Sequence, residues 1–283
     1  MSPKIKSYIQ LILPEYMILI FFTLLAGSLI LSALPTSLIL IFLSLSFAMF
    51  SLNIINNIID IELDRINKPT RPLPSGKITV KSAKQFAAFC VVISFAFSYF
   101  VNFQAVLIIA AFHVISVLYS VPPFRLRRLV LADNIAGGTV YGLFPFLMLW
   151  TTTQGPLPWH FFILFGGLVF AIASTKDFED VKGEKKTGIS TLPIKLGLRN
   201  AMMFTILTIL ILVLMMLTLS LIGEIPAIYI YPSMASLILT AAYGLIFSRH
   251  LKPSKGIVTQ SKIVTLGMIT VVLIEILYAV SSM

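Results

Sequence analysis

The sequence predicts an all-α, polytopic membrane protein. Of its 283 residues, 58% are hydrophobic and only 11% are charged, whereas soluble domains carry about 25% charged residues. Apolar stretches long enough to cross a bilayer, roughly 17 to 25 residues each, recur along the whole chain. This composition excludes a water-soluble globular protein. We expect residues 1–283 to form a single membrane-embedded domain.

Nine apolar stretches have the length of a transmembrane helix. They lie at approximately 15–34, 37–59, 85–102, 104–121, 130–151, 158–175, 200–222, 226–247 and 262–281. The first follows Lys4 and Lys6, as the apolar part of a signal peptide would. Its apolar core is longer than the usual 7 to 15 residues of a cleaved signal, so we expect it to be retained. The sequence therefore predicts nine spans.

The distribution of basic residues supports this count. All 21 Lys and Arg residues fall in the N-terminal segment and in the loops after the second, fourth, sixth and eighth spans, and the other loops contain none. This is the positive-inside pattern of a multi-pass protein of the cell membrane. It predicts a cytoplasmic N-terminus and an external C-terminus. Because topology accounts for the net charge of +10, we expect no nucleic-acid partner.

A first polar cluster follows the second span. Asn56, Asp60 and Asp64 are spaced at i, i+4 and i+8, so they form one stripe if the helix continues past the apolar run. A stripe of oxygen atoms at a membrane edge suits a hard cation. The amide of Asn56 has an alternative use as a hydrogen bond between helices, worth about 0.6 kcal/mol. The following RPLPSG segment stiffens the chain around Arg71 and holds this side chain in place.

A second acidic cluster follows the sixth span. Asp177, Asp180 and Glu184 are spaced at i, i+3 and i+7, which places them on one face if the segment is helical. Mg²⁺ binds oxygen ligands, usually one or two protein carboxylates, and completes its shell with water and substrate phosphate. Two such clusters predict a cradle for a magnesium diphosphate. The alternative is that these are solvated loop charges, but helical spacing at the ends of spans favours ligands.

At these residues the chain resembles the UbiA-type intramembrane prenyltransferases. The first family motif, N-x-x-x-D-x-x-x-D followed by RPLPSG, stands at 56–64 and 71–76. The second, D-x-x-D-x-x-x-D, stands at 177–184 with Glu184 replacing the last aspartate. A third, Y-S-x-P-P-x-R, stands at 119–125. The resemblance implies a nine-helix bundle around a central cavity, with Mg²⁺ and a prenyl diphosphate bound beneath cytoplasmic cap loops.

The resemblance also implies roles for individual residues. The metal ligands would be Asp60, Asp64, Asp177, Asp180 and, directly or through water, Glu184. The substrate-binding residues would be Asn56, Lys68, Arg71, Lys77, Arg125 and Lys176, with Arg71 and Lys176 on the diphosphate. Metals and cations stabilise the charge on the leaving diphosphate. Tyr119 would stabilise the allylic cation through its ring, unless it is an ordinary interfacial aromatic residue.

The acceptor is predicted from the same resemblance. The second motif and its flanks are most similar to the archaeal branch that transfers a geranylgeranyl group from geranylgeranyl diphosphate to geranylgeranylglyceryl phosphate, making an ether-lipid precursor. Lys68, Lys77, Arg125 and Arg127 would hold this lipid-like acceptor's phosphate. The alternative is an aromatic prenyltransferase acting on 4-hydroxybenzoate or a quinone precursor. A transporter or lipid-binding protein is more remote, because the acidic clusters lie at span ends and not at the bilayer centre.

Overall fold

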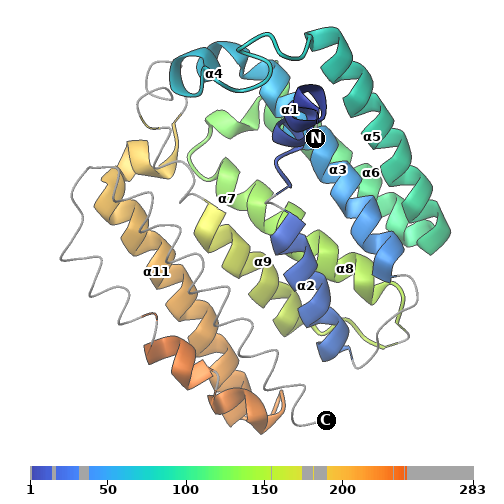
Figure 1. Ribbon diagram of the computed structural model, residues 1–283. Coiled ribbons are helices and arrows are strands. Elements are labelled where there is room, and N and C mark those ends of the chain that lie inside the picture. The colour runs from blue at the N-terminus through green and yellow to red at the C-terminus, as the bar shows by residue number, and fades with distance from the viewer. Residues whose placement is uncertain are drawn as a thin grey trace.

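The computed structural model of the chain describes residues 2–14, 17–31, 38–153, 155–173, 181, 190–231, 233–238 and 240. Every regular element in these ranges is helical (Figure 1). The α-helices are α1 (Pro3–Ile12), α2 (Met17–Ile30), α3 (Leu38–Ile59), α4 (Ile61–Asn67), α5 (Val80–Val101), α6 (Phe103–Ser120), α7 (Ala132–Gly137), α8 (Phe144–Trp150), α9 (Trp159–Ala173) and α11 (Leu192–Leu221). The short elements are the 3-10 helices η2 (Leu126–Arg128) and η5 (Ala227–Tyr229) and the π-helix η3 (Gly138–Leu143).

Several of these helices have the properties of membrane spans. Among the described residues, α3, α5, α6 and α11 are long and apolar enough to cross a bilayer, and α9 is apolar but shorter. The prediction of an all-helical, multi-pass membrane protein is therefore confirmed. The count of nine stays a prediction, because the ninth predicted span, at 262–281, lies outside the described residues.

The core lies where the apolar helices meet. Helix α3 packs against α1, α2, α5, α6 and α8, while α9 packs between the α7–η3 segment and α11. Fully buried side chains such as Leu45, Phe112 and Met148 join α3, α6 and α8 in one hydrophobic cluster. A second cluster, which includes Phe146, Phe165 and Leu212, joins α8, α9 and α11. Burial of these faces positions the ends of α3 and α6, which carry the polar motifs.

The predicted span 130–151 is one helix with a wide turn in its middle. Elements α7, η3 and α8 follow one another directly, and the backbone is right-handed helical at both junctions. Two glycines in η3 let it approach α9 closely. A Cβ at Gly142 would lie 2.5 Å from the carbonyl oxygen of Phe165, and one at Gly138 would lie 2.7 Å from that of Gly166. Only glycine allows this backbone approach.

The polar motifs gather at one end of the bundle. Helices α1 and α4 and the start of α5 lie together at the top of Figure 1. At the other end, the side chain of Asn102, between α5 and α6, donates to the carbonyl oxygen of Thr151 over 3.2 Å. The basic segment after α3 and the Lys- and Arg-free turns at 102 and 152 thus lie at opposite ends, as the charge pattern predicts. Which end is cytoplasmic stays a prediction.

The structure also contains elements that the hydropathy pattern does not predict. Helix α1 is a separate helix before the first span, begun by Ser2, whose hydroxyl accepts from Ile5 N, and ended at Leu13, whose φ is 51°. Helix α11 begins eight residues before the predicted 200, with a kink at Gly197, where φ is 78°. Both segments carry lysines among apolar residues, so their hydropathy is too low to mark them as spans.

Candidate functional site

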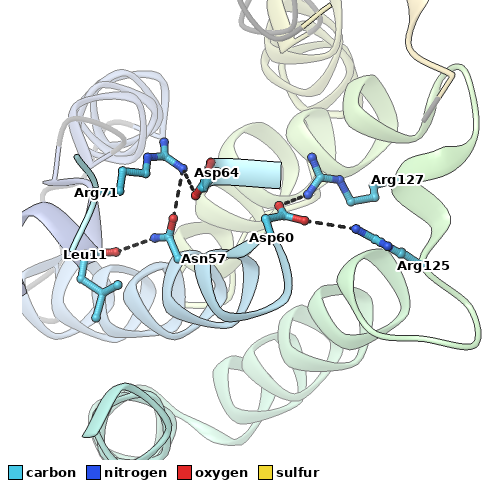
Figure 2. A network of polar contacts seen from close by, with 7 residues as sticks. All are labelled: Leu11, Asn57, Asp60, Asp64, Arg71, Arg125 and Arg127. Atoms are coloured by element: carbon cyan, nitrogen blue, oxygen red, sulfur yellow. Dashed lines mark hydrogen bonds and ion pairs between the residues drawn. The ribbon is translucent and has the colours of Figure 1, made fainter. Parts of the chain in front are cut away.

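The aspartates of the first motif lie one helical turn apart, as predicted. The backbone N–H of Asp60 donates to Asn56 O over 2.9 Å, and that of Asp64 donates to Asp60 O over 2.7 Å. Helical hydrogen bonding therefore continues across the junction of α3 and α4. Only 8% of Asp60 and 4% of Asp64 is exposed. Two carboxylates are thus buried side by side where the apolar part of the helix ends (Figure 2).

Two arginines from the segment after α6 neutralise Asp60. Arg125 Nη2 lies 3.2 Å from Oδ1, and Arg127 Nη1 contacts Oδ2. Figure 2 shows both guanidinium groups approaching this carboxylate from the side away from Asp64. The Nε atoms of both arginines are buried, and neither has a hydrogen-bond partner in the part of the chain that the structure describes. Both oxygens of Asp60 are therefore engaged, and the group carries an excess positive charge.

Among the described residues, Asp64 has one arginine partner. Arg71 Nη1 donates to Asp64 Oδ2 over 2.8 Å and to Asn57 Oδ1 over 3.1 Å. Asp64 Oδ1 accepts no hydrogen bond from the described residues. Burial raises the pKa of the Asp64 carboxyl above its usual value, while Arg71 and Lys68 act in the opposite direction. A buried carboxylate with one free oxygen attracts a further cation.

The turn after α4 positions Arg71. The backbone N–H of Arg71 donates to Lys68 O over 3.0 Å, and the hydroxyl of Ser75 donates to Arg71 O over 2.6 Å. Leu73 is buried against the cluster that contains Leu11 and Ile78. The apolar anchor and the proline-rich backbone together hold Arg71 next to Asp64.

The other predicted site residues have varied surroundings. Asn56 accepts a hydrogen bond from the hydroxyl of Ser120, which is the interhelical contact considered above as its alternative role. Tyr119 is buried at the end of α6, whereas Lys77 is exposed on the turn before α5. Lys68 lies close enough to lower the pKa of Asp64. The remaining predicted residues, Lys176, Asp177, Asp180 and Glu184, lie outside the described residues.

The donor set fits a magnesium ion. Within the described ranges, no three His, Cys, Asp or Glu side chains come together. Mg²⁺ does not require this, because it is commonly held by one or two carboxylates with water and substrate phosphates. Asp60 and Asp64 supply such carboxylates, and both already bind cationic side chains. The arginines beside them are suited to binding the phosphate groups of a ligand. The residues present therefore fit Mg²⁺ bound together with a phosphate-bearing ligand.

Sequence reasoning missed two features of this site. Asn57, which contacts Arg71, was overlooked, although its i, i+7 spacing to Asp64 places both on one helical face. Arg127 was predicted only as a contact for the acceptor's phosphate, and its ion pair with Asp60 was not foreseen. No sequence signal reveals that pair, because it depends on how the segment after α6 packs against α3.

Comparison with known proteins places the chain in a family. The family model described as the UbiA prenyltransferase family matches residues 16–278. The chain belongs to the UbiA prenyltransferase family. It is therefore a prenyltransferase and a multi-pass membrane protein, as its motifs predict.

Individual members of the UbiA family resemble the chain over most of its length. It is 32% identical over 215 residues to digeranylgeranylglyceryl phosphate synthase of Methanocaldococcus jannaschii, covering 75% of each chain. A structure solved in a study of digeranylgeranylglyceryl phosphate synthase in membranes is 25% identical, with a TM-score of 0.71 over 99% of this chain and 100% of the other. A UbiA homolog from Archaeoglobus fulgidus, bound to DMAPP and Mg²⁺, has the same fold, with a TM-score of 0.75 at 20% identity over 95% of this chain and 99% of that chain.

Proposed function

We propose that this UbiA-family protein transfers a geranylgeranyl group from geranylgeranyl diphosphate to geranylgeranylglyceryl phosphate in a Mg²⁺-dependent reaction. The product is digeranylgeranylglyceryl phosphate. The observation that carries the proposal is the pair of buried carboxylates, Asp60 and Asp64, with three arginine partners. The similarity to the Methanocaldococcus jannaschii synthase supports this choice of acceptor.

The charges of the site favour an acceptor that carries a phosphate. With Mg²⁺ held by Asp60 and Asp64, the side chains of Arg71, Arg125 and Arg127 would be available to anionic ligands. Arg71 lies on the Asp64 side, while Arg125 and Arg127 lie on the Asp60 side (Figure 2). Two separate groups of guanidinium suit two phosphate-bearing substrates, because arginine binds phosphate in a bidentate manner. Following the family resemblance, we assign the diphosphate to Arg71 and the acceptor's phosphate to Arg125 and Arg127.

The residues of the site have different roles in the proposed reaction. Asp60 and Asp64, with Asp177, Asp180 and Glu184, would hold Mg²⁺, which neutralises the leaving diphosphate when bound. Arg71 and Lys176 would bind the diphosphate, and Lys68 adds positive charge on the same side, because it lies close enough to Asp64 to lower the pKa of that carboxyl. The allylic C–O bond breaks and its electron pair leaves with the diphosphate. An acceptor hydroxyl oxygen then bonds to the allylic carbon to form the ether, and its proton passes to the released diphosphate.

The apolar bundle and Tyr119 protect the reacting carbon. Tyr119 is buried at the end of α6, next in sequence to Ser120, whose hydroxyl bonds Asn56. The end of α6 is thus joined to α3 next to the aspartates, and the ring face of Tyr119 would stabilise an allylic cation there. The surrounding apolar helices take the isoprenoid tail and exclude water that would otherwise capture the cation.

A competition between acceptors tests the proposal. The purified chain in detergent, with Mg²⁺ and geranylgeranyl diphosphate, is offered equal amounts of geranylgeranylglyceryl phosphate and 4-hydroxybenzoate. We expect the doubly alkylated glyceryl phosphate as the main product, and its loss when EDTA is added. Prenylated 4-hydroxybenzoate as the main product would instead support the aromatic prenyltransferase and overturn the assignment of Arg125 and Arg127.

A further inference from the structure

We infer that Asn57 is a positioning residue that sets the orientation of Arg71 toward the diphosphate. This inference rests on the proposed function, because it assigns the diphosphate to Arg71. Asn57 itself touches neither substrate. It acts through the guanidinium group and links the N-terminal helix α1 to the aspartate pair.

The hydrogen bonds of Asn57 fix the direction of its amide. Nδ2 donates to the carbonyl oxygen of Leu11 over 3.0 Å, at the end of α1. A carbonyl oxygen only accepts, so the NH₂ group must face Leu11 and Oδ1 must face Arg71. Oδ1 accepts from Arg71 Nη1 over 3.1 Å. Asn57 is only 6% exposed, so water does not compete effectively for either contact. Figure 2 shows the resulting chain from Leu11 through Asn57 and Arg71 to Asp64.

These contacts anchor one part of the guanidinium and leave the rest available. Both hydrogens of Arg71 Nη1 are used, one on Asn57 and one on Asp64. Its Nε and Nη2 make no hydrogen bond to any described residue, and 30% of the side chain is exposed. Nε and Nη2 form the fork that matches two oxygens of a phosphate group. Asn57 therefore holds Arg71 with this fork free for a ligand.

The hydrogen bond between Arg71 and Asn57 would persist when a cation binds to Asp64. The ion pair between Arg71 and Asp64 weakens when a divalent cation binds the same carboxylate. The amide of Asn57 is neutral, so its hydrogen bond to Nη1 does not depend on that charge. An arginine that is already oriented loses less side-chain freedom when its ligand binds. Removing Asn57 should therefore weaken diphosphate binding more than it affects the chemical step.

The chain supplies a matched control one helical turn earlier. Asn53 lies on α3 and is also 6% exposed. Its Nδ2 donates to the carbonyl oxygen of Ile12 over 2.8 Å, so it docks the end of α1 as Asn57 does. It makes no hydrogen bond to Arg71. A variant of Asn53 therefore loses the docking contact alone, whereas a variant of Asn57 loses both the docking contact and the guanidinium contact.

The first test compares Asn57→Ala with Asn53→Ala in the full chain. Affinity for inorganic pyrophosphate in the presence of Mg²⁺ is measured by calorimetry, and KM and kcat are measured with geranylgeranyl diphosphate. Loss of a hydrogen bond to a charged group corresponds to about a tenfold change. We expect Asn57→Ala to weaken pyrophosphate binding and raise KM about tenfold while kcat falls less than about threefold. Asn53→Ala should stay within about twofold, and equal effects of the two variants would overturn the inference.

The second test asks whether Asn57 acts through Arg71. In an Arg71→Ala background, Asn57→Ala should change pyrophosphate affinity by less than about twofold, because the group that it positions is gone. A full tenfold effect in that background overturns the inference. If Asn57→Ala does not fold, Asn57→Leu preserves the side-chain volume, lacks the acceptor and should show the same tenfold loss. If the unsubstituted chain transfers no prenyl group, the proposed function fails, and the pyrophosphate affinities still decide the role of Asn57.

Discussion

Arg127 and Asp60 form an ion pair in which only 12% and 11% of the two side chains is exposed. Arg125 occupies the other oxygen of the same carboxylate. Asp64, one turn further along, contacts one arginine and has an oxygen without a partner among the described residues. The two aspartates are therefore not equivalent. Asp64 has an oxygen atom available for a metal, whereas a metal that binds Asp60 must compete with Arg125 and Arg127 for its oxygens.

We expect Asp64→Asn to reduce Mg²⁺-dependent prenyl transfer at least about 100-fold, because a neutral amide is a poor ligand for Mg²⁺. The same loss is expected for Asp177→Asn, from its place in the second motif. Initial rates with geranylgeranyl diphosphate at saturating Mg²⁺ measure the effect. Glu62→Gln is the control, since Glu62 is exposed and forms an ion pair with Arg65 on the same helix, and should stay within about twofold. Near-normal activity of Asp64→Asn would remove this residue from the metal site.

Asp60→Asn should destabilise the protein more than Asp64→Asn does. The substitution leaves Arg125 and Arg127 largely buried without their counter-charge, which costs about 3–5 kcal/mol when one partner of a buried ion pair is removed. Asp64→Asn frees only Arg71, whose side chain is 30% exposed and can reach water. Free energies of unfolding in mixed detergent micelles, measured without Mg²⁺, test this order. Equal losses would show that Arg125 and Arg127 find other partners.

Arg127→Gln should bind Mg²⁺ more tightly than the unsubstituted protein. Arg127 holds an oxygen of Asp60, so it competes with a metal for that carboxylate. Removing this competitor should lower the Kd for Mg²⁺ alone about three- to tenfold, as measured by calorimetry. Arg128→Gln is the control, because it removes the same charge at the following residue. The side chain of Arg128 is exposed and forms no ion pair with the described residues. If both variants change the Mg²⁺ affinity equally, the change results from the lower net charge of the protein, and Arg127 does not compete with Mg²⁺ for Asp60.

The sequence predicted the elements that hydropathy defines. Helix α3 (Leu38–Ile59) and helix α6 (Phe103–Ser120) begin and end within about a residue of the predicted 37–59 and 104–121. A bilayer span needs a continuous apolar run, so its ends are visible as the first polar residues. The same rule placed Asp60 and Asp64 at the end of a helix. Their i, i+4 spacing then fixed their shared face without any tertiary information.

The arginine partners of Asp60 were not predictable in the same way. Arg125 and Arg127 lie 65 and 67 residues from Asp60 along the chain, and their approach depends on the packing of α6 against α3. Helix α1 escaped prediction because its exposed face carries Lys4 and Lys6, so it is amphipathic and not a span. The contact of Asn57 with Leu11 follows from the docking of that helix.

Gly142→Ala should destabilise the bundle by about 3 kcal/mol, at the upper end of the range for overpacking. The new Cβ would lie 2.5 Å from the carbonyl oxygen of Phe165 and 2.8 Å from the Cα of Gly166. These are backbone atoms of α9, so the strain cannot be relieved by a rotamer change and the two helices must separate. Gly155→Ala is the matched control, because a Cβ there meets nothing within 4 Å. Detergent unfolding of both variants measures the difference. An unchanged free energy of unfolding for Gly142→Ala would show that η3 and α9 do not pack at backbone distance.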